Sequence, residues 1–189
     1  MANNPPDWIG LVLAGGASSR MGTDKALLEL SGRTLLDRAV AVLEAAGAER
    51  VIVSGDRPGY DSVADIRPGL GPLGGLESVL AARGELLRGR LLLALPVDVP
   101  ALDARAVNTL LHTAYDAPGA VFSNHPLPLA AWITPDFERA LAAILEGPGA
   151  ASAFRLGRGL KVREIAPVEA DLRNVNTPES WAALRREFA

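Results

Sequence analysis

The chain contains no cysteine. Disulfide bonds, thiolate catalysis and cysteine-based metal sites are therefore excluded. It also lacks a basic excess, because its net charge is −3, and this argues against general nucleic-acid binding. No run of about 18 apolar residues is present, so no transmembrane helix is expected. The opening stretch MANNPPDW has neither a basic region nor an apolar segment, so we expect a cytoplasmic protein without a secretory signal or a membrane partner.

Lysine is also scarce. The chain has 17 arginines but only two lysines, Lys25 and Lys161. Lys25 lies in the glycine-rich segment LAGGASSRMGTDKALL, residues 13–28, directly behind an apolar run. A compact ammonium group suits a phosphate held by a point charge, so a functional role is favoured over a chance position.

The order of the apolar segments predicts the fold class. Runs rich in Val, Ile and Leu alternate with segments of helical period, which indicates an α/β fold whose mainly parallel sheet is covered on both faces. The length suits a single domain over residues 1–189. We expect strands at 9–14, 50–54, 90–95, 119–122, 129–133 and 161–165. We expect helices at 35–46, 74–82, 104–114, 135–145 and 178–188.

The glycine-rich segment follows the first strand, where ligands of such folds bind at the carboxyl end of the sheet. It matches neither the P-loop pattern, since Gly22 is not followed by lysine, nor the G-x-G-x-x-G pattern. Gly15 and Gly16 still allow the backbone to approach a ligand closely, and successive N–H groups can bind an anion. With the charges of Arg20 and Lys25, the segment is predicted to bind a polyphosphate. The alternative is a solvated strand-to-helix turn.

The ordered pattern G-G-x-S-x-R-M-G-x-D-K, residues 15–25, resembles the signature of nucleotidyltransferases with a Rossmann-like fold. It is most similar to that of the molybdenum cofactor guanylyltransferases. The resemblance implies a three-layer αβα sandwich of the nucleotide-diphospho-sugar transferase type. It also implies that the loop wraps a nucleoside triphosphate, with Lys25 on the phosphates and Arg20 beside it as catalytic charges. The implied nucleotide contacts in this segment are Leu13, Ala14, Gly15, Gly16 and Lys25.

An aspartate follows the clearest buried strand in the sequence LLLALPVDVPAL. Asp98 is thereby placed at the carboxyl edge of the sheet, facing the predicted triphosphate loop. Mg²⁺ prefers one or two carboxylates together with phosphate oxygens and water, so Asp98 is predicted to be catalytic, to bind the metal and to contact the nucleotide. The alternative is an aspartate that caps the turn before Val99 and Pro100. The family has Asp-x-Pro at the corresponding place.

Three further positions carry weaker resemblances. The segment GPLGG, residues 71–75, resembles a family segment that opens a helix lining the nucleotide site. Asp65, just upstream, falls near an acidic position that contacts the nucleotide, although the spacing differs by about one residue. Ser54 stands where relatives often have an asparagine near the base, and a serine reaches less far.

The C-terminal part holds the candidates for acceptor binding. The segment NVNTPES matches the family's Asn-x-Asn-Thr-Pro-Glu, which implies that Asn174 and Asn176 bind the pterin substrate or assist the metal. Helix-start chemistry explains the Thr-Pro pair equally well, but not both asparagines. His125, in NHPLPLAAW, lies in an element similar to one that relatives have near the acceptor, which implies a substrate role; the alternative is a histidine of a loop or of the surface. The basic group Arg155, Arg158 and Lys161 either receives an anionic acceptor or forms a solvated face.

The resemblance implies transfer of GMP from GTP to the phosphate of molybdopterin, with Mg²⁺ as cofactor and pyrophosphate as leaving group. Molybdoenzymes or other proteins of cofactor biosynthesis would then be partners. Gly15 resembles the guanine-using members, and a missing Cβ gives room for a purine. The alternatives are a related enzyme that uses CTP or another phosphorylated acceptor, and a nucleotide-binding module that does not catalyse.

Overall fold

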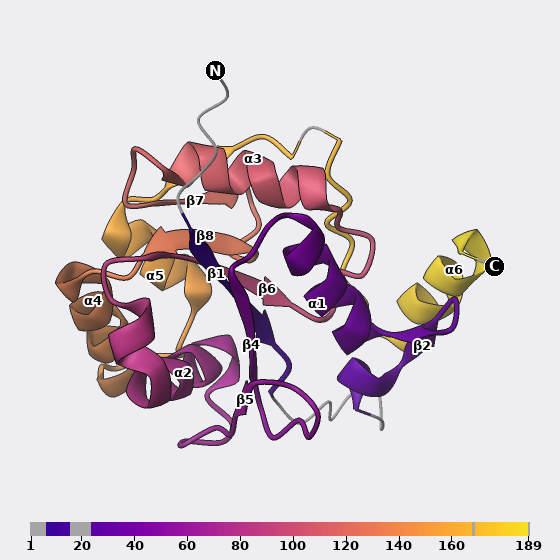
Figure 1. Ribbon diagram of the computed structural model, residues 1–189, viewed down its shortest axis with the longest axis horizontal. Helices are drawn as coiled ribbons and strands as arrows, with labels where there is room; N and C mark the ends of the chain where they lie inside the picture. Colours follow the sequence, from indigo (N-terminus) through magenta and orange to yellow (C-terminus); the bar gives the residue numbers. More distant parts are fainter. Residues whose placement is uncertain (1–6, 16–23, 168, 189) are drawn as a thin grey trace.

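The structure is a computed structural model that describes residues 7–15, 24–167 and 169–188. Its centre is a seven-stranded sheet with the strand order β5-β4-β1-β6-β8-β7-β9 (Figure 1). The strands are β1 (Trp8–Leu13), β4 (Arg50–Ser54), β5 (Ser62–Val63), β6 (Leu91–Pro96), β7 (Gly119–Phe122), β8 (Leu129–Trp132) and β9 (Arg163–Ile165).

The sheet is mainly parallel, as predicted, with one strand reversed. β1 runs parallel to both β4 and β6. At the two edges of the sheet, β5 is parallel to β4 and β9 is parallel to β7. β8 is antiparallel to both of its neighbours, β6 and β7. The short connection between β7 and β8 explains this reversal, because a parallel pair needs a long crossover.

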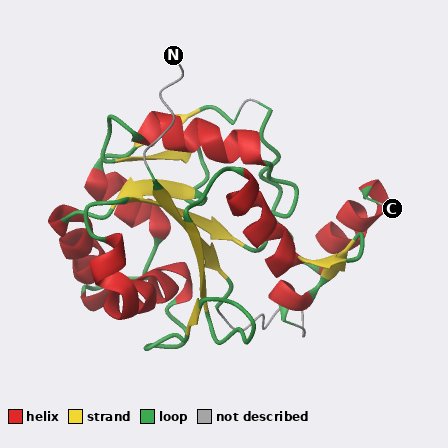
Figure 2. Cartoon of the chain, viewed as in Figure 1, coloured by secondary structure: helices red, strands yellow, loops and turns green. Residues whose placement is uncertain are grey.

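Helices cover both faces of the sheet and complete three layers (Figure 2). α1 (Leu35–Ala45) and α3 (Ala104–Ala114) share one apolar core, which contains Val12 of β1. α2 (Gly71–Leu87), α4 (Pro135–Glu146) and α5 (Ala153–Leu160) share the other, which contains Ile9 and Leu11. Successive residues of β1 thus face opposite cores, and all six are buried, as expected for a strand covered on both sides.

Several elements lie where the sequence predicts them, and others differ for identifiable reasons. β4, α3 and β7 have the predicted bounds. α2 begins earlier than predicted because Pro72 fits its first turn, and its backbone leaves helical geometry at Arg83, next to the predicted end. The prediction missed α5, whose two glycines lower helix propensity. The predicted strand at 161–165 is shorter, because Lys161 ends α5 in a left-handed conformation.

A small unit lies beside the main sheet. β2 (Glu29–Leu30) and β3 (Arg33–Thr34) form a hairpin whose turn residues, Ser31 and Gly32, both have positive φ. α6 (Pro178–Glu187) packs on this hairpin through a separate apolar cluster, Leu30, Leu35, Val175 and Leu184. We call the hairpin and α6 together the C-terminal unit, which Figure 1 shows on the side of the molecule away from α4. Two-residue strands carry too little periodicity to be predicted from sequence.

The topology defines the place where a ligand would bind. The chain passes from β1 to β4 on one side of β1, whereas β6 occupies the other side. The carboxyl ends of β1 and β6 therefore form a switch point, the usual binding place of open α/β sheets. Leu13 pairs with Pro96 there, so the glycine-rich segment and the residues that follow Pro96 leave the sheet side by side. Among the described residues, no helix has the length and apolar character needed to cross a bilayer.

Candidate active site

Three polar side chains from distant parts of the chain meet at the switch point. The ammonium of Lys25 lies 3.6 Å from a carboxylate oxygen of Asp98. It also donates a 2.5 Å hydrogen bond to the side-chain oxygen of Asn176. All three residues were predicted site residues, and the structure brings them together. We call them the Lys25 cluster.

Each member of the cluster is held by its own element. Lys25 begins a short 3-10 helix, η1 (Lys25–Leu27). Asp98 follows β6, and its backbone carbonyl accepts a 2.8 Å hydrogen bond from the amide of Val175. Val175 is buried in the core of the C-terminal unit, so this bond anchors the residue just before Asn176. Packing of that unit therefore contributes to the position of Asn176.

The Lys25 cluster is partly buried, and burial changes its electrostatics. The side chains of Lys25 and Asp98 are 18% and 24% exposed. Burial raises the pKa of the Asp98 carboxyl, and the neighbouring Lys25 opposes this shift without cancelling it. An additional cation beside Asp98 would therefore stabilise its charged form. Among the described residues, no group of three or more His, Cys, Asp or Glu side chains converges on one point, so a metal held by Asp98 would need ligands from elsewhere. This donor set fits Mg²⁺, which accepts few carboxylates and completes its shell with phosphate oxygens and water.

Asp65 lies against the start of the glycine-rich segment. A Cβ on Gly15 would lie 2.7 Å from a carboxylate oxygen of Asp65, so only glycine permits this approach. The other oxygen, Oδ1, is buried and accepts no hydrogen bond from the residues that the structure describes. Burial also raises the pKa of this carboxyl. A buried acceptor without a donor fits a site completed by a ligand's N–H or O–H group.

This contact changes the physical explanation for Gly15. The expectation was that its missing Cβ leaves room for a purine. Instead, the space at its Cα is filled by the carboxylate of Asp65. The glycine at position 15 therefore allows Asp65 to approach the loop, and any effect of Gly15 on a bound base stays a prediction.

Ser54 ends β4 close to the same edge of the sheet. It is 1% exposed, because Gly75 of α2 lies directly over it. A Cβ on Gly75 would lie 2.6 Å from the Ser54 hydroxyl oxygen, so the glycine-rich start of α2 lets the helix close over β4. Contact between Ser54 and a bound base stays a prediction.

Of the other predicted residues, His125 and Asn174 are not members of the Lys25 cluster, and two fall outside the described residues. His125 lines a separate hollow of about 490 Å³ together with residues 167 and 169–173. Within the described part of the chain, no member of the Lys25 cluster lines that hollow. Asn174 is exposed. Gly16 and Arg20 fall outside the described residues.

The basic group on α5 and at its C-cap is solvent-facing. Arg155, Arg158 and Lys161 are all exposed. The guanidinium of Arg155 donates hydrogen bonds to the carbonyls of Pro148 and Ala150, at 3.3 Å and 3.2 Å. Arg155 therefore closes the preceding loop onto α5.

Arg57 was missed by the sequence prediction. It follows β4 and donates a 2.6 Å hydrogen bond to the carbonyl of Ala14, the last residue before Gly15. Its two terminal nitrogens also bind both carboxylate oxygens of Asp24, the residue before Lys25. The only sequence signal was its position after the second predicted strand, in a sheet whose ligands bind at the carboxyl ends of the strands.

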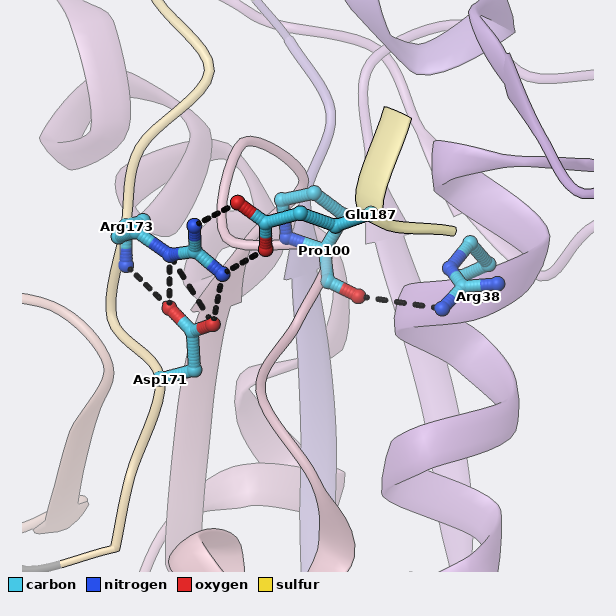
Figure 3. Close-up of polar contacts among 5 residues, drawn as sticks. All are labelled: Arg38, Pro100, Asp171, Arg173 and Glu187. Carbon is cyan, nitrogen blue, oxygen red and sulfur yellow. Dashed lines mark hydrogen bonds and ion pairs between the residues drawn. The ribbon is translucent and has the colours of Figure 1, made fainter. Parts of the chain in front are cut away.

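A second arginine ties the segment before Asn174 to α6. Figure 3 shows Arg173 between Asp171 and Glu187, with two nitrogens bound to the Glu187 carboxylate at 2.7 Å. Nearby, Arg38 of α1 lies 3.5 Å from the carbonyl of Pro100 and stacks over the ring of Phe188, 5.3 Å from its centre. These contacts lie between the C-terminal unit and the segments that precede Asn174 and follow Asp98.

Comparison with known proteins agrees with this geometry. Residues 10–163 match the sequence model of the MobA-like NTP transferase domain. A protein of Xanthomonas euvesicatoria pv. vesicatoria named molybdenum cofactor guanylyltransferase is 41% identical over 184 residues, which cover 95% of either chain.

Solved structures share the fold across nearly the whole chain. A nucleotidyl transferase from Methanothermobacter has a TM-score of 0.73 at 22% identity, covering 97% of this chain and 98% of that one. The molybdopterin-guanine dinucleotide biosynthesis protein A of Archaeoglobus fulgidus also has a TM-score of 0.73, at 17% identity and with 95% and 97% covered. These likenesses confirm the predicted nucleotide-diphospho-sugar transferase type of α/β fold. With the matched domain and the 41% identical relative, they lead to one conclusion: the chain belongs to the MobA-like NTP transferase family.

Proposed function

We propose that the protein transfers GMP from GTP to the phosphate of molybdopterin and releases pyrophosphate. The observation that carries this proposal is the Lys25 cluster, a partly buried cation, carboxylate and amide at the switch point of the sheet. Support comes from the family and from a relative named molybdenum cofactor guanylyltransferase, which aligns with 95% of the chain. In this proposal GTP and molybdopterin are the small-molecule partners, molybdoenzymes receive the product, and the reaction takes place in the cytoplasm.

The reaction needs positioning and charge neutralisation more than proton transfer. The acceptor phosphate attacks the α-phosphorus of GTP in line, a P–O bond forms, and the bond to the pyrophosphate oxygen breaks. The attacking phosphate is already an anion, so no general base is required. Lys25 stabilises charge on the phosphates, with Arg20 as its companion.

Asp98 is the proposed Mg²⁺ ligand, consistent with a buried carboxylate whose charge Lys25 only partly offsets. When bound, Mg²⁺ would neutralise charge on the phosphate oxygens. Asp98 itself would hold its carboxylate at the carboxyl end of β6 and keep the Lys25 ammonium directed into the site.

The other residues bind the two substrates. Leu13, Ala14, Gly15 and Gly16 wrap the nucleotide, Ser54 and Asp65 lie at its base and sugar, and the unpartnered oxygen of Asp65 accepts from the nucleotide. Asn176 faces the reacting phosphates beside Lys25. Asn174 and His125 bind the pterin, which would then extend from the Lys25 cluster toward the hollow lined by residues 167 and 169–173.

A pyrophosphate-release assay tests the proposal against its rivals. GTP and CTP are each supplied with and without molybdopterin and with and without Mg²⁺. The proposal expects release only with GTP, molybdopterin and Mg²⁺ together. Release with CTP instead would indicate the cytidylyl alternative. Tight GTP binding without turnover in any mixture would indicate a nucleotide-binding module that does not catalyse.

A further inference from the structure

Arg57 connects the two described ends of the glycine-rich segment. Its side chain is 15% exposed. One terminal nitrogen donates to the carbonyl of Ala14 at 2.6 Å and to a carboxylate oxygen of Asp24 at 3.1 Å. The other terminal nitrogen binds the second carboxylate oxygen of Asp24. A planar guanidinium with several donors can hold such a set of acceptors, whereas a lysine ammonium cannot match its geometry.

Asp24 passes this constraint on to Lys25. Oδ1 of Asp24, which accepts the 3.1 Å hydrogen bond from Arg57, also accepts a 3.0 Å hydrogen bond from the amide of Ala26. This second bond caps η1, the short helix that begins at Lys25. The direction in which the Lys25 backbone presents its long, flexible side chain therefore depends on a carboxylate held in a fork by Arg57.

Stability alone is a poor explanation for Arg57. Its Nε is buried and donates to no atom among the residues that the structure describes. A buried donor without an acceptor destabilises the folded state. A partly buried ion pair such as this one, in which Asp24 is 35% exposed, is itself weak grounds for stability, because desolvation and solvent screening offset the attraction. The arrangement fits a group retained for the geometry that it imposes.

We propose that Arg57 is a positioning residue: by holding Asp24 and Ala14, it orients the ammonium of Lys25 toward Asp98 and Asn176. Its guanidinium acts through Asp24 and is not assigned any contact with substrate. The kinetic consequence rests on the proposed guanylyl transfer, whereas the structural consequence does not.

The structural consequence can be measured without any substrate. Because the chain has only two lysines, a sample labelled with ¹³C,¹⁵N-lysine gives two sets of side-chain signals, and Lys161 serves as an internal reference. Arg57→Gln should shift and broaden the Lys25 side-chain signals and leave those of Lys161 unchanged. Arg50→Gln is the matched control, because Arg50 begins β4, the strand that precedes Arg57, and forms an exposed pair with Asp61. Lys25 signals that are the same in Arg57→Gln as in the wild type would overturn the proposal.

The kinetic consequence is tested by a double-mutant cycle. Arg57→Gln is expected to lower kcat/KM for GTP about 10- to 100-fold, mostly through kcat, because a small misplacement of a catalytic charge slows the reaction strongly. Arg57→Lys should retain part of this activity, since it keeps the charge beside Asp24. In a Lys25→Ala background, Arg57→Gln should change the residual rate less than about twofold, because residues that act through one another are not additive. Equal effects in both backgrounds would contradict the proposal.

The two arms separate the possible failures. If the wild-type protein does not turn over GTP with molybdopterin, the proposed function fails, while the lysine spectrum still tests Arg57. If the wild type is active and Arg57→Gln leaves the Lys25 side-chain signals unchanged, the proposed function stands and the positioning role is wrong.

Discussion

Two arginines tie distant segments together in this protein, and they differ mainly in burial. Arg57 joins the two ends of the glycine-rich segment with a side chain that is 15% exposed. Arg173 joins Asp171 to Glu187 of α6 with a side chain that is 54% exposed. Water screens the second pair and leaves it little net energy, whereas the guanidinium of Arg57 is mostly shielded from water, although its partner Asp24 is 35% exposed. Similar hydrogen-bond geometry therefore predicts different consequences: Arg57 should govern activity, and packing rather than Arg173 should hold the C-terminal unit.

The largest effect on activity should come from Lys25, which Arg57 is proposed to position, and from Asp98 beside it. Lys25→Ala and Asp98→Ala are each expected to lower kcat on the order of 10²- to 10³-fold, because the first removes the cation proposed to stabilise the phosphates and the second removes the proposed Mg²⁺ ligand that also directs that cation. Steady-state pyrophosphate release measures this loss, and circular dichroism should show an intact fold. Near-normal turnover in either variant would show that the residue is not needed for catalysis. Arg57, which is proposed to act through Lys25, would then have no expected effect on activity.

The second largest effect concerns stability. It tests whether packing, rather than Arg173, holds the C-terminal unit. Leu184 is 3% exposed in the apolar cluster that joins α6 to the hairpin. Leu184→Ala should lower the free energy of unfolding by about 2–3 kcal/mol, since it leaves a cavity in a small core. Urea denaturation measures this change. Leu27→Ala is a suitable control, because Leu27 is 58% exposed and should matter far less.

A moderate effect is expected where the loop meets Asp65. Gly15→Ala would place a Cβ 2.7 Å from the Asp65 carboxylate, which must then move. Displacing a packed side chain in this way costs roughly 1–2 kcal/mol, so KM for GTP should rise on the order of tenfold with a smaller change in kcat. Titration of GTP in the steady-state assay tests this expectation. An unchanged KM would show that the position of Asp65 does not affect nucleotide binding.

The smallest effect on stability should come from the exposed ion pairs of Arg173 with Asp171 and Glu187. Arg173 lowers the pKa of Asp171 and of Glu187, so the stabilisation is present above the unfolded-state pKa of these carboxyls and is lost as the pH falls through their lower folded-state pKa. Arg173→Gln should lower Tm at neutral pH by at most about 2 °C. The difference from the wild type should vanish in acid. A Tm loss as large as that of Leu184→Ala would overturn the comparison between the two ties.

Sequence patterns predicted the elements whose own residues specify them. α3 follows a capping aspartate and has a clear apolar stripe, so its bounds were predicted correctly. α5 contains two glycines and the β2–β3 hairpin has two-residue strands, so neither carries a strong local pattern. Their stability comes from packing against neighbours, which a linear pattern does not contain.

The residues of the candidate site also fall into those that the sequence predicted and those that it did not. Lys25, Asp98 and Asn176 stood out through motifs, and the structure brings them into contact. Arg57 did not stand out, because one arginine among 17 carries no local sign of the two segments that it joins. His125 was grouped with the acceptor residues by resemblance, and it lines a hollow that no member of the Lys25 cluster lines within the described residues. Its role stays a prediction.

The sequence by itself determined the α/β class, the main strands and the residue types of the Lys25 cluster. Apolar periodicity and caps are local, and a motif is read along the chain without knowledge of contacts. Only the tertiary structure decided that Lys25 meets Asn176, 151 residues away, that Arg57 holds both ends of the glycine-rich segment, and that Asp65 occupies the space beside Gly15. These contacts depend on which strands become neighbours and how closely the helices pack on them, and the chain settles both only when the whole core forms.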